Sequence, residues 1–147
     1  MIYTSENHAR TLAGEENVSC LCHADLHAGN LHLALDGTLY LIDWDTVEFA
    51  PKERDLMFVG AGLIGGHRDP ADEHRLFFTG YGEANVSNRL LSYYRYERIL
   101  EDIALYAEEL SSGLQKAANP WQSFGYLESN FDPAGTIDLA FRADERI

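Results

Sequence analysis

The chain has 147 residues, 46% of them hydrophobic, which is enough for one domain with a core. Its net charge of −13 excludes the basic stripe of a nucleic-acid-binding protein and favours cationic small molecules as partners, although acidity also simply keeps a protein dispersed. No apolar run is long enough to span a membrane, and Cys20 and Cys22 are too close for an unstrained disulfide, so we expect a cytoplasmic protein with reduced thiols.

The first segments are predicted to be a helix and a strand. Ser5 suits the N-cap of a helix that runs to about Leu12, and the thin apolar face of this helix suggests the tail of something longer. The apolar run 18–22 favours a buried strand, which would place His23 at its C-terminal end. Ligand sites favour such strand ends.

A β-hairpin is predicted next. Two alternating segments flank Asp36-Gly37, a pair that favours a two-residue turn of type I′. The predicted strands are 31–35 and 39–43. Because hairpin strands run antiparallel, we expect Asn30 and Asp43 to lie at the same mouth of the hairpin.

The remaining sequence has helical periodicity. Asp55 is the predicted N-cap of the first helix, which Gly65-Gly66 would end, and Pro70 suits the first turn of the second. The longest helix has an apolar stripe that we expect to pack on the core. The predicted helices are 54–63, 70–78, 87–110, 119–131 and 134–143.

Strands at the front followed only by helices predict an α+β fold with a mostly helical body. We expect a single domain over residues 1–147. Within it, residues 18–55 would carry the candidate site and residues 54–147 the helical body.

Polar side chains are concentrated around the predicted hairpin. His23, Asp25 and Asn30 have the spacing of the kinase catalytic loop, in which an Asp meets the acceptor hydroxyl and an Asn binds metal. Asp43 would add a second hard oxygen ligand, as Mg²⁺ prefers. The alternative is that Asp25, Asn30 and Asp43 only cap turns and strand ends. The pattern predicts a phosphoryl-transfer site in which His23 fixes the loop and does no chemistry.

Three segments resemble the aminoglycoside phosphotransferase and choline kinase-like family, which has a protein-kinase-like fold. Residues 23–30 are similar to its catalytic loop, 42–45 to its metal-binding segment and 52–56 to the start of the next helix. The segment from Trp44 to Phe58 is most similar to the spectinomycin phosphotransferase branch. The resemblance covers about residues 18–110.

The resemblance implies a role for each matching position. Asp25 would orient the acceptor hydroxyl, and Asn30 and Asp43 would hold Mg²⁺ on the phosphates of ATP, with GTP not excluded. Asp55 would brace the catalytic loop. His27 would lie near the γ-phosphate.

Other acidic residues have less defined expectations. Asp45 would face a metal or substrate, or would be a solvated turn residue. The family implies a small cationic acceptor such as an aminoglycoside or aminocyclitol. Its amines would bind acidic residues on the later helices, unless these only form solvated faces; the candidates are Asp69, Asp72, Glu101 and Asp102.

Three other kinds of site match part of the sequence. Gly60 to Gly65 has the spacing of a dinucleotide fingerprint, but its context fails because no helix opens after it. Cys20, Cys22, His23 and His27 have the composition of a zinc site. The set His23, Asp25, His27 and His32 would suit a metal-dependent hydrolase, but the spacings of Asn30 and Asp43 would then be coincidences.

The match is to a C-terminal lobe alone. The sequence has no glycine-rich loop on paired strands, and its two lysines, Lys52 and Lys116, both follow the catalytic loop. Phosphoryl transfer depends on positioning and charge neutralisation, so we expect a fragment that is weak or inactive alone. The exposed lobe interface would favour a homo-oligomer. The alternative function is a non-catalytic nucleotide- or ligand-binding module.

Overall fold

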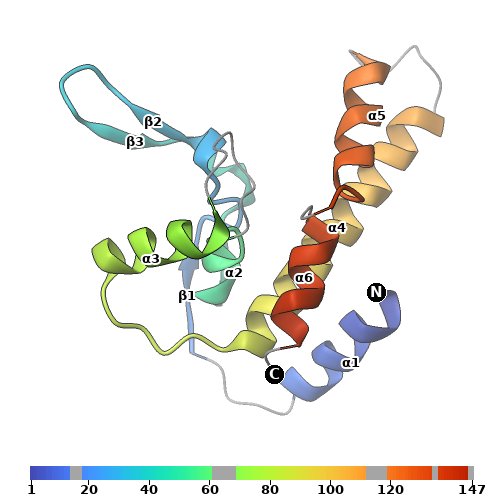
Figure 1. Ribbon diagram of the computed structural model, residues 1–147, viewed down its shortest axis with the longest axis horizontal. Coiled ribbons are helices and arrows are strands. Elements are labelled where there is room, and N and C mark those ends of the chain that lie inside the picture. The colour runs from blue at the N-terminus through green and yellow to red at the C-terminus, as the bar shows by residue number, and fades with distance from the viewer. Residues whose placement is uncertain (14–17, 61–68, 112–118, 134–135, 146–147) are drawn as a thin grey trace.

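A computed structural model describes residues 1–13, 18–60, 69–111, 119–133 and 136–145 as an α+β arrangement of helices and two small antiparallel sheets (Figure 1). The helices are α1 (Ile2–Leu12), α2 (Glu53–Leu56), α3 (Pro70–Tyr81), α4 (Asn88–Ser111), α5 (Pro120–Ser129) and α6 (Thr136–Asp144). The strands are β1 (Ser19–Cys22), β2 (Leu31–Leu33), β3 (Leu39–Leu41) and β4 (Glu48–Pro51). None of the helices described is long and apolar enough to cross a bilayer.

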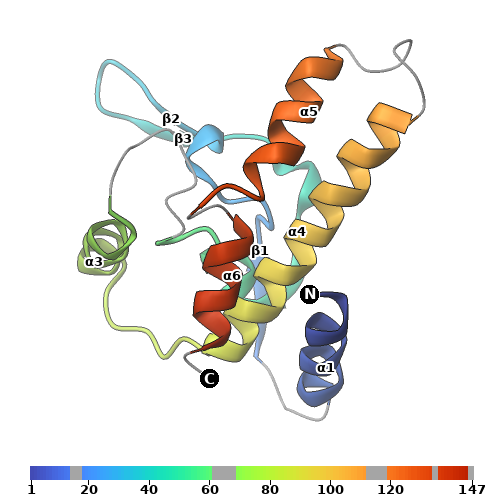
Figure 2. The same ribbon diagram turned by 45° about the vertical axis from the view of Figure 1, so that its right-hand side comes forward.

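Helix α4 is the centre of the helical body, and α1, α5 and α6 lie against it (Figure 2). Its buried residues include Leu90, Tyr94, Tyr96 and Ile99, which recur at helical spacing. Burial raises the pKa of Tyr96 to about 12 because the phenolate would lose its hydration. The predicted long helix is confirmed. Its buried residues lie in its N-terminal half, from Leu90 to Ile99.

Strand β1 pairs with β4 in antiparallel register, with Ser19 opposite Pro51 and Cys22 opposite Glu48. The sequence analysis missed β4, which is short and follows the polar turn of residues 44–46. The prediction that 18–22 is buried is wrong: Leu21 is 58% exposed, and Cys22 is the buried residue of β1. The strand pairs with β4 alone, so its other edge is unpaired among the described residues.

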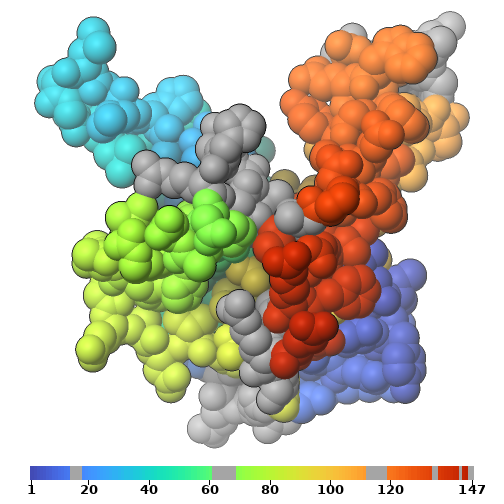
Figure 3. Space-filling model, viewed as in Figure 1, coloured from blue at the N-terminus to red at the C-terminus, as the bar shows by residue number. Residues whose placement is uncertain are grey.

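The predicted hairpin forms, with Leu31 opposite Leu41. Its turn is not type I′, because Gly37 has a positive φ of 87° and Asp36 does not. Instead Gly37 donates its N–H to the carbonyl of Ala34, and Ala34 donates to that of Thr38, which makes a three-residue loop. In Figures 1 and 3 the hairpin projects from the body and stands apart from α5.

The helix starts differ from two predictions. Ser5 lies inside α1, which begins at Ile2 without a side-chain cap. Asp55 lies inside α2, and its carboxylate is used elsewhere. The start of α3 is confirmed, because Asp69 caps it by accepting the N–H of Ala71 and Pro70 occupies its first turn. The helix predicted over 54–63 is wrong in length, because α2 ends at Leu56 and residues 57–60 form turns, with Gly60 at a positive φ of 70°. Gly65-Gly66 and the start of the 134–143 helix lie outside the described residues.

A buried arginine ties the strands to the helical body. Arg54 is 9% exposed; its Nε donates to Glu48 at 2.7 Å and its Nη1 to Glu97 at 3.3 Å, and its guanidinium lies over the ring of Tyr94. These contacts join β4, α2 and α4. They place the loop that follows β1 beside the middle of α4.

Candidate active site

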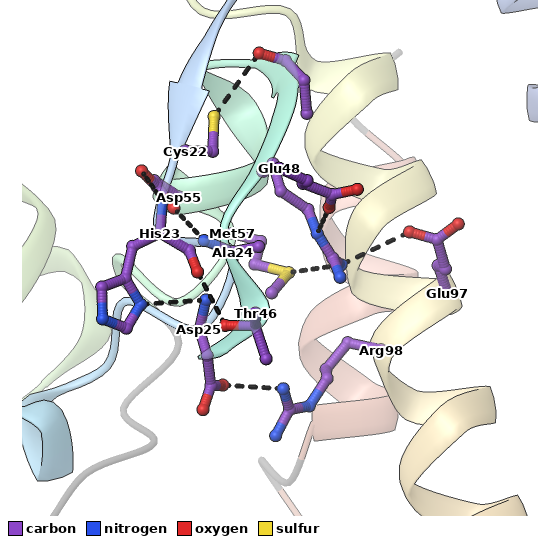
Figure 4. A network of polar contacts seen from close by, with 12 residues as sticks. Cys22, His23, Ala24, Asp25, Thr46, Glu48, Asp55, Met57, Glu97 and Arg98 are labelled. Atoms are coloured by element: carbon purple, nitrogen blue, oxygen red, sulfur yellow. Dashed lines mark hydrogen bonds and ion pairs between the residues drawn. The ribbon is translucent and has the colours of Figure 1, made fainter. Parts of the chain in front are cut away.

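The loop that follows β1 is held by one carboxylate. Asp55 accepts the backbone N–H of His23 at 3.0 Å and that of Ala24 at 2.7 Å (Figure 4). Ala24 is 1% exposed and has a left-handed φ of 66°, a conformation that L-residues adopt at a cost. The two hydrogen bonds compensate for this conformation, so the chain turns sharply directly after the strand.

His23 links the loop to the hairpin. Its ring is buried; Nδ1 accepts the N–H of Asp25 at 3.3 Å, and Nε2 donates to the carbonyl of Ile42 at 2.8 Å. The hydroxyl of Thr46 donates to the carbonyl of His23 at 2.7 Å. Every polar atom of the imidazole is therefore engaged in holding backbone.

Asp25 is surrounded by donors. Its Oδ1 accepts Nη1 of Arg98, from α4, at 2.7 Å, and its Oδ2 lies 3.3 Å from Nδ2 of Asn30 and 3.4 Å from Nε2 of His27. The carboxylate is 15% exposed. Sequence reasoning missed Arg98, because no local pattern relates it to Asp25; the only signal is its helical i,i+4 spacing to Asp102.

His27 has a defined orientation. The N–H of Gly29 donates to its Nδ1 at 3.0 Å, which leaves the ring proton on Nε2, the nitrogen that faces Asp25. A Cβ at Gly29 would lie 2.7 Å from the His27 ring, so this close approach favours glycine. The ring also meets Phe58 edge-on, with centroids 5.5 Å apart.

Asn30 and the residue before Asp43 are joined across the mouth of the hairpin: Ile42 donates its N–H to the carbonyl of Asn30 at 3.0 Å. Nδ2 of Asn30 donates to the Asp25 carbonyl at 2.9 Å, and no described residue donates to its Oδ1. Asp43 is exposed, has a left-handed φ of 65°, and receives no hydrogen bond from the described residues. Asn30 and Asp43 therefore flank the mouth of the hairpin, and neither side-chain oxygen group receives a hydrogen bond from the described residues.

A pocket of about 260 Å³ is lined by His27 and Arg98, which both contact Asp25. Phe58, Tyr106 and Tyr126 supply its aromatic wall, and Arg98 and Asp102 its charges. Burial raises the pKa of Asp102, and the neighbouring Arg98 opposes this rise. A larger hollow of about 1160 Å³ is lined by residues of α3 and α4, together with Gly60. None of the candidate catalytic or metal-binding residues lines it.

The other acidic candidates lie elsewhere. Asp69 caps α3, Asp72 pairs with Arg75, and Glu101 is exposed and does not line the pocket. Asp45 is exposed on the turn of residues 44–46 and has no hydrogen bond or ion pair with a described residue. Asp102 is thus the one of these acids that the fold brings to Asp25.

The alternative metal sites do not assemble in the described part of the chain, where no three His, Cys, Asp or Glu side chains converge. Cys20 and Cys22 have sulfurs 3.8 Å apart, but Cys22 also donates to the carbonyl of Ala50, and burial is the main cause that raises its pKa to about 12. The zinc and hydrolase alternatives therefore lack their ligand sets. The dinucleotide fingerprint, 60–65, lies almost wholly outside the described residues.

Comparison with known proteins adds an independent line of evidence. Residues 5–93 match the model of the phosphotransferase enzyme family. The structure is similar to that of spectinomycin phosphotransferase APH(9)-Ia in complex with ADP and spectinomycin, at 42% identity over 97% of this chain with a TM-score of 0.85. It is also similar to the AMP-bound complex of that enzyme, at 41% identity over 95% of this chain with a TM-score of 0.79. The chain spans 43% and 42% of those crystallised chains, and no curated protein matches it.

Proposed function

This chain belongs to the phosphotransferase enzyme family, and from that premise we propose that it forms the acceptor and metal side of a small-molecule kinase. The reaction would transfer the γ-phosphoryl group of ATP to a hydroxyl of a small cationic acceptor such as an aminocyclitol. The observation that carries this proposal is the arrangement of Asp25, which contacts two residues that line a pocket, with Asn30 and Asp43 at the adjoining hairpin mouth. The resemblance to this family, seen first in the loop residues, is confirmed.

In this proposal Asp25 orients the acceptor hydroxyl and accepts its proton. A carboxylate whose Oδ2 lies against Asn30 and His27 cannot rotate freely, so its orientation is fixed. His27 presents the N–H of Nε2 on the same side and would donate to a phosphoryl oxygen. His23 and Asp55 hold the loop and do not meet substrate.

The donor set of Asn30 and Asp43 fits Mg²⁺. Both present oxygen, the Asn30 Nδ2 atom is already engaged by Asp25, and the Asp43 carboxylate is open. Bound there, Mg²⁺ would neutralise charge on the nucleotide phosphates. Asp45 follows Asp43 by two residues and lies on an exposed turn. We propose for it only an auxiliary role, as a further metal ligand or a substrate contact.

ATP and a cationic acceptor are supported by the neighbouring structures, whose chains were crystallised with ADP and spectinomycin and with AMP. This chain carries the same fold over nearly all its length, at more than 40% identity. We propose ATP as the donor, with GTP as the alternative nucleotide.

The chain would be the C-terminal lobe of the protein-kinase-like fold, a single domain over residues 1–147. It spans less than half of the neighbouring chains, and its sequence has no glycine-rich hairpin or strand lysine to position the phosphates. Since catalysis of phosphoryl transfer consists largely of positioning and charge neutralisation, we expect weak or no activity from the chain alone. The second candidate function, a non-catalytic binding module, rests on the same observation.

Titration calorimetry with ATP, with and without Mg²⁺, tests the proposal. Asp43→Asn removes the charge but keeps a residue that tolerates the left-handed backbone, so it isolates metal binding from folding. We expect Mg²⁺-dependent ATP binding that Asp43→Asn weakens at least about tenfold. Asp36→Asn, on the exposed hairpin turn, is the matched control, because an Asn oxygen can still accept the N–H of Thr38, and it should bind nearly as the unmodified chain does. Equal binding with and without Mg²⁺ would contradict the metal assignment, and no binding at all would leave the non-catalytic module.

A further inference from the structure

Arg98 joins two carboxylates that come from different parts of the chain. Its Nη1 donates to Oδ1 of Asp25 at 2.7 Å, and its Nε lies 3.0 Å from Oδ1 of Asp102. The guanidinium carbon lies 5.6 Å from the centre of the Phe58 ring, at the wall of the 260 Å³ pocket. The cation therefore contacts the candidate base, as Figure 4 shows, and also lines the pocket in which an acceptor would bind.

The contact with Asp25 occupies a position that the proposed reaction needs. Oδ2 of Asp25 already faces Asn30 and His27, so Oδ1 is the oxygen that remains for an acceptor hydroxyl. Arg98 covers that oxygen with a short, charge-assisted hydrogen bond. An acceptor hydroxyl that hydrogen-bonds to Oδ1 would compete with the guanidinium for that oxygen.

The contact with Asp102 is incomplete. The Nε atom of Arg98 is buried and donates no hydrogen bond to any described residue, so its approach to Asp102 is an ion pair without hydrogen-bond geometry. Asp102 is itself desolvated, as its raised pKa indicates. Arg95 also lines the pocket, but its Nε and Nη2 donate to the carbonyls of Met57 and Val59. The partly buried carboxylate of Asp102 is thus left with a poorly aligned partner.

We propose that Arg98 is a specificity-determining residue that competes with the acceptor for Asp25 and Asp102 and is displaced by a cationic amino alcohol. The hydroxyl of the acceptor would replace Nη1 at Asp25, and its ammonium would replace Nε at Asp102. Both nitrogens of Arg98 are bonded to one carbon, so the groups that replace them should lie on neighbouring carbons of the ligand. The inference rests on the proposed function and adds the arrangement of groups that the acceptor must carry.

If Arg98 competes with the acceptor, its removal should tighten acceptor binding. If Arg98 only held the site in place, its removal should weaken acceptor binding. The test titrates the intact chain with spectinomycin at pH 8, without nucleotide or metal, and uses myo-inositol as an uncharged cyclitol control. Arg98→Met, which keeps the apolar stem, should bind spectinomycin about tenfold more tightly because the internal competitor is gone. Asp102→Asn should bind it about tenfold more weakly, and binding of myo-inositol, which has no ammonium, should be insensitive to Asp102→Asn.

Unchanged or weaker binding of spectinomycin by Arg98→Met would overturn the proposal, as would failure of the unmodified chain and every variant to bind. If Arg98→Met does not fold by circular dichroism, Arg98→Lys replaces it. One ammonium cannot bridge both carboxylates, so this variant should bind spectinomycin about threefold more tightly, and equal or weaker binding overturns the proposal. Because this titration contains no ATP or Mg²⁺, its failure is distinguishable from a failure of the Asp43→Asn experiment.

Discussion

The loop of residues 23–30 and the hairpin of residues 31–41 are consecutive in sequence, yet they are held in opposite ways. The loop is polar, and its groups are engaged by α2, α4 and the far end of the hairpin. The hairpin is apolar, and Leu33, Leu35 and Leu39 are at least 61% exposed. Polar side chains are thus held inside while leucines face solvent, the reverse of the usual distribution.

The difference indicates what each region is for. A loop whose hydrogen bonds are satisfied by the same chain keeps its geometry without a partner. A hairpin with contiguous exposed leucines is typical of a surface that another polypeptide or a second copy covers. We propose that the site's geometry is internal to this chain and that the hairpin face is an interface.

Removal of the Asp55 carboxylate should cause the largest loss of stability, because it releases the loop of residues 23–30. Asp55→Ala leaves the N–H groups of His23 and Ala24 without their acceptor, and we expect the free energy of unfolding to fall by about 2–4 kcal/mol. Urea unfolding followed by circular dichroism measures it. Glu6→Ala, which removes an exposed partner of Arg10 on α1, is the control and should change the value by less than about 0.5 kcal/mol. Equal losses in the two variants would show that the loop does not depend on Asp55.

Ala24 tests the strained turn at the start of the loop. Ala24→Val places a β-branched side chain at a buried, left-handed position, and we expect a loss of about 2 kcal/mol in the free energy of unfolding. Ala24→Gly is the matched control, because glycine adopts this φ without strain, and it should match or slightly exceed the unmodified chain. If valine and glycine were equivalent in urea unfolding, the backbone conformation of the turn would be different from that described.

The hairpin should give the smallest change in stability. Leu33→Ser and Leu35→Ser alter side chains that are 73% and 110% exposed, so the free energy of unfolding should stay within about 0.5 kcal/mol. The same changes should reduce the self-association that we propose for this face, as measured by light scattering after size exclusion. Leu105→Ser, on an exposed position of α4, is the control and should leave the association unchanged. An unmodified chain that is monomeric at all concentrations would count against a homo-oligomer.

Local sequence patterns predicted the positions of helices and strands better than they predicted turn types and capping residues. The helices begin where Pro70 and Asn119 indicate, and Asp36-Gly37 marks the hairpin turn. The type I′ turn was wrong because the Asp36 carboxylate accepts the N–H of Thr38, a local contact that favours the longer loop. Asp55 was wrongly predicted to cap α2 because its use by His23 and Ala24, more than thirty residues away, has no local signature.

The sequence by itself determined the identity and order of the candidate groups. The spacing of His23, Asp25 and Asn30 on one loop, with Asp43 beyond a turn, follows from residue types and hairpin antiparallelism, which are local properties. Only the tertiary structure decided what surrounds Asp25, because Arg98 and Asp102 reach it through the packing of α4 against α2. Such packing depends on how buried surfaces fit together, and contacts across seventy residues leave no periodic trace in the sequence.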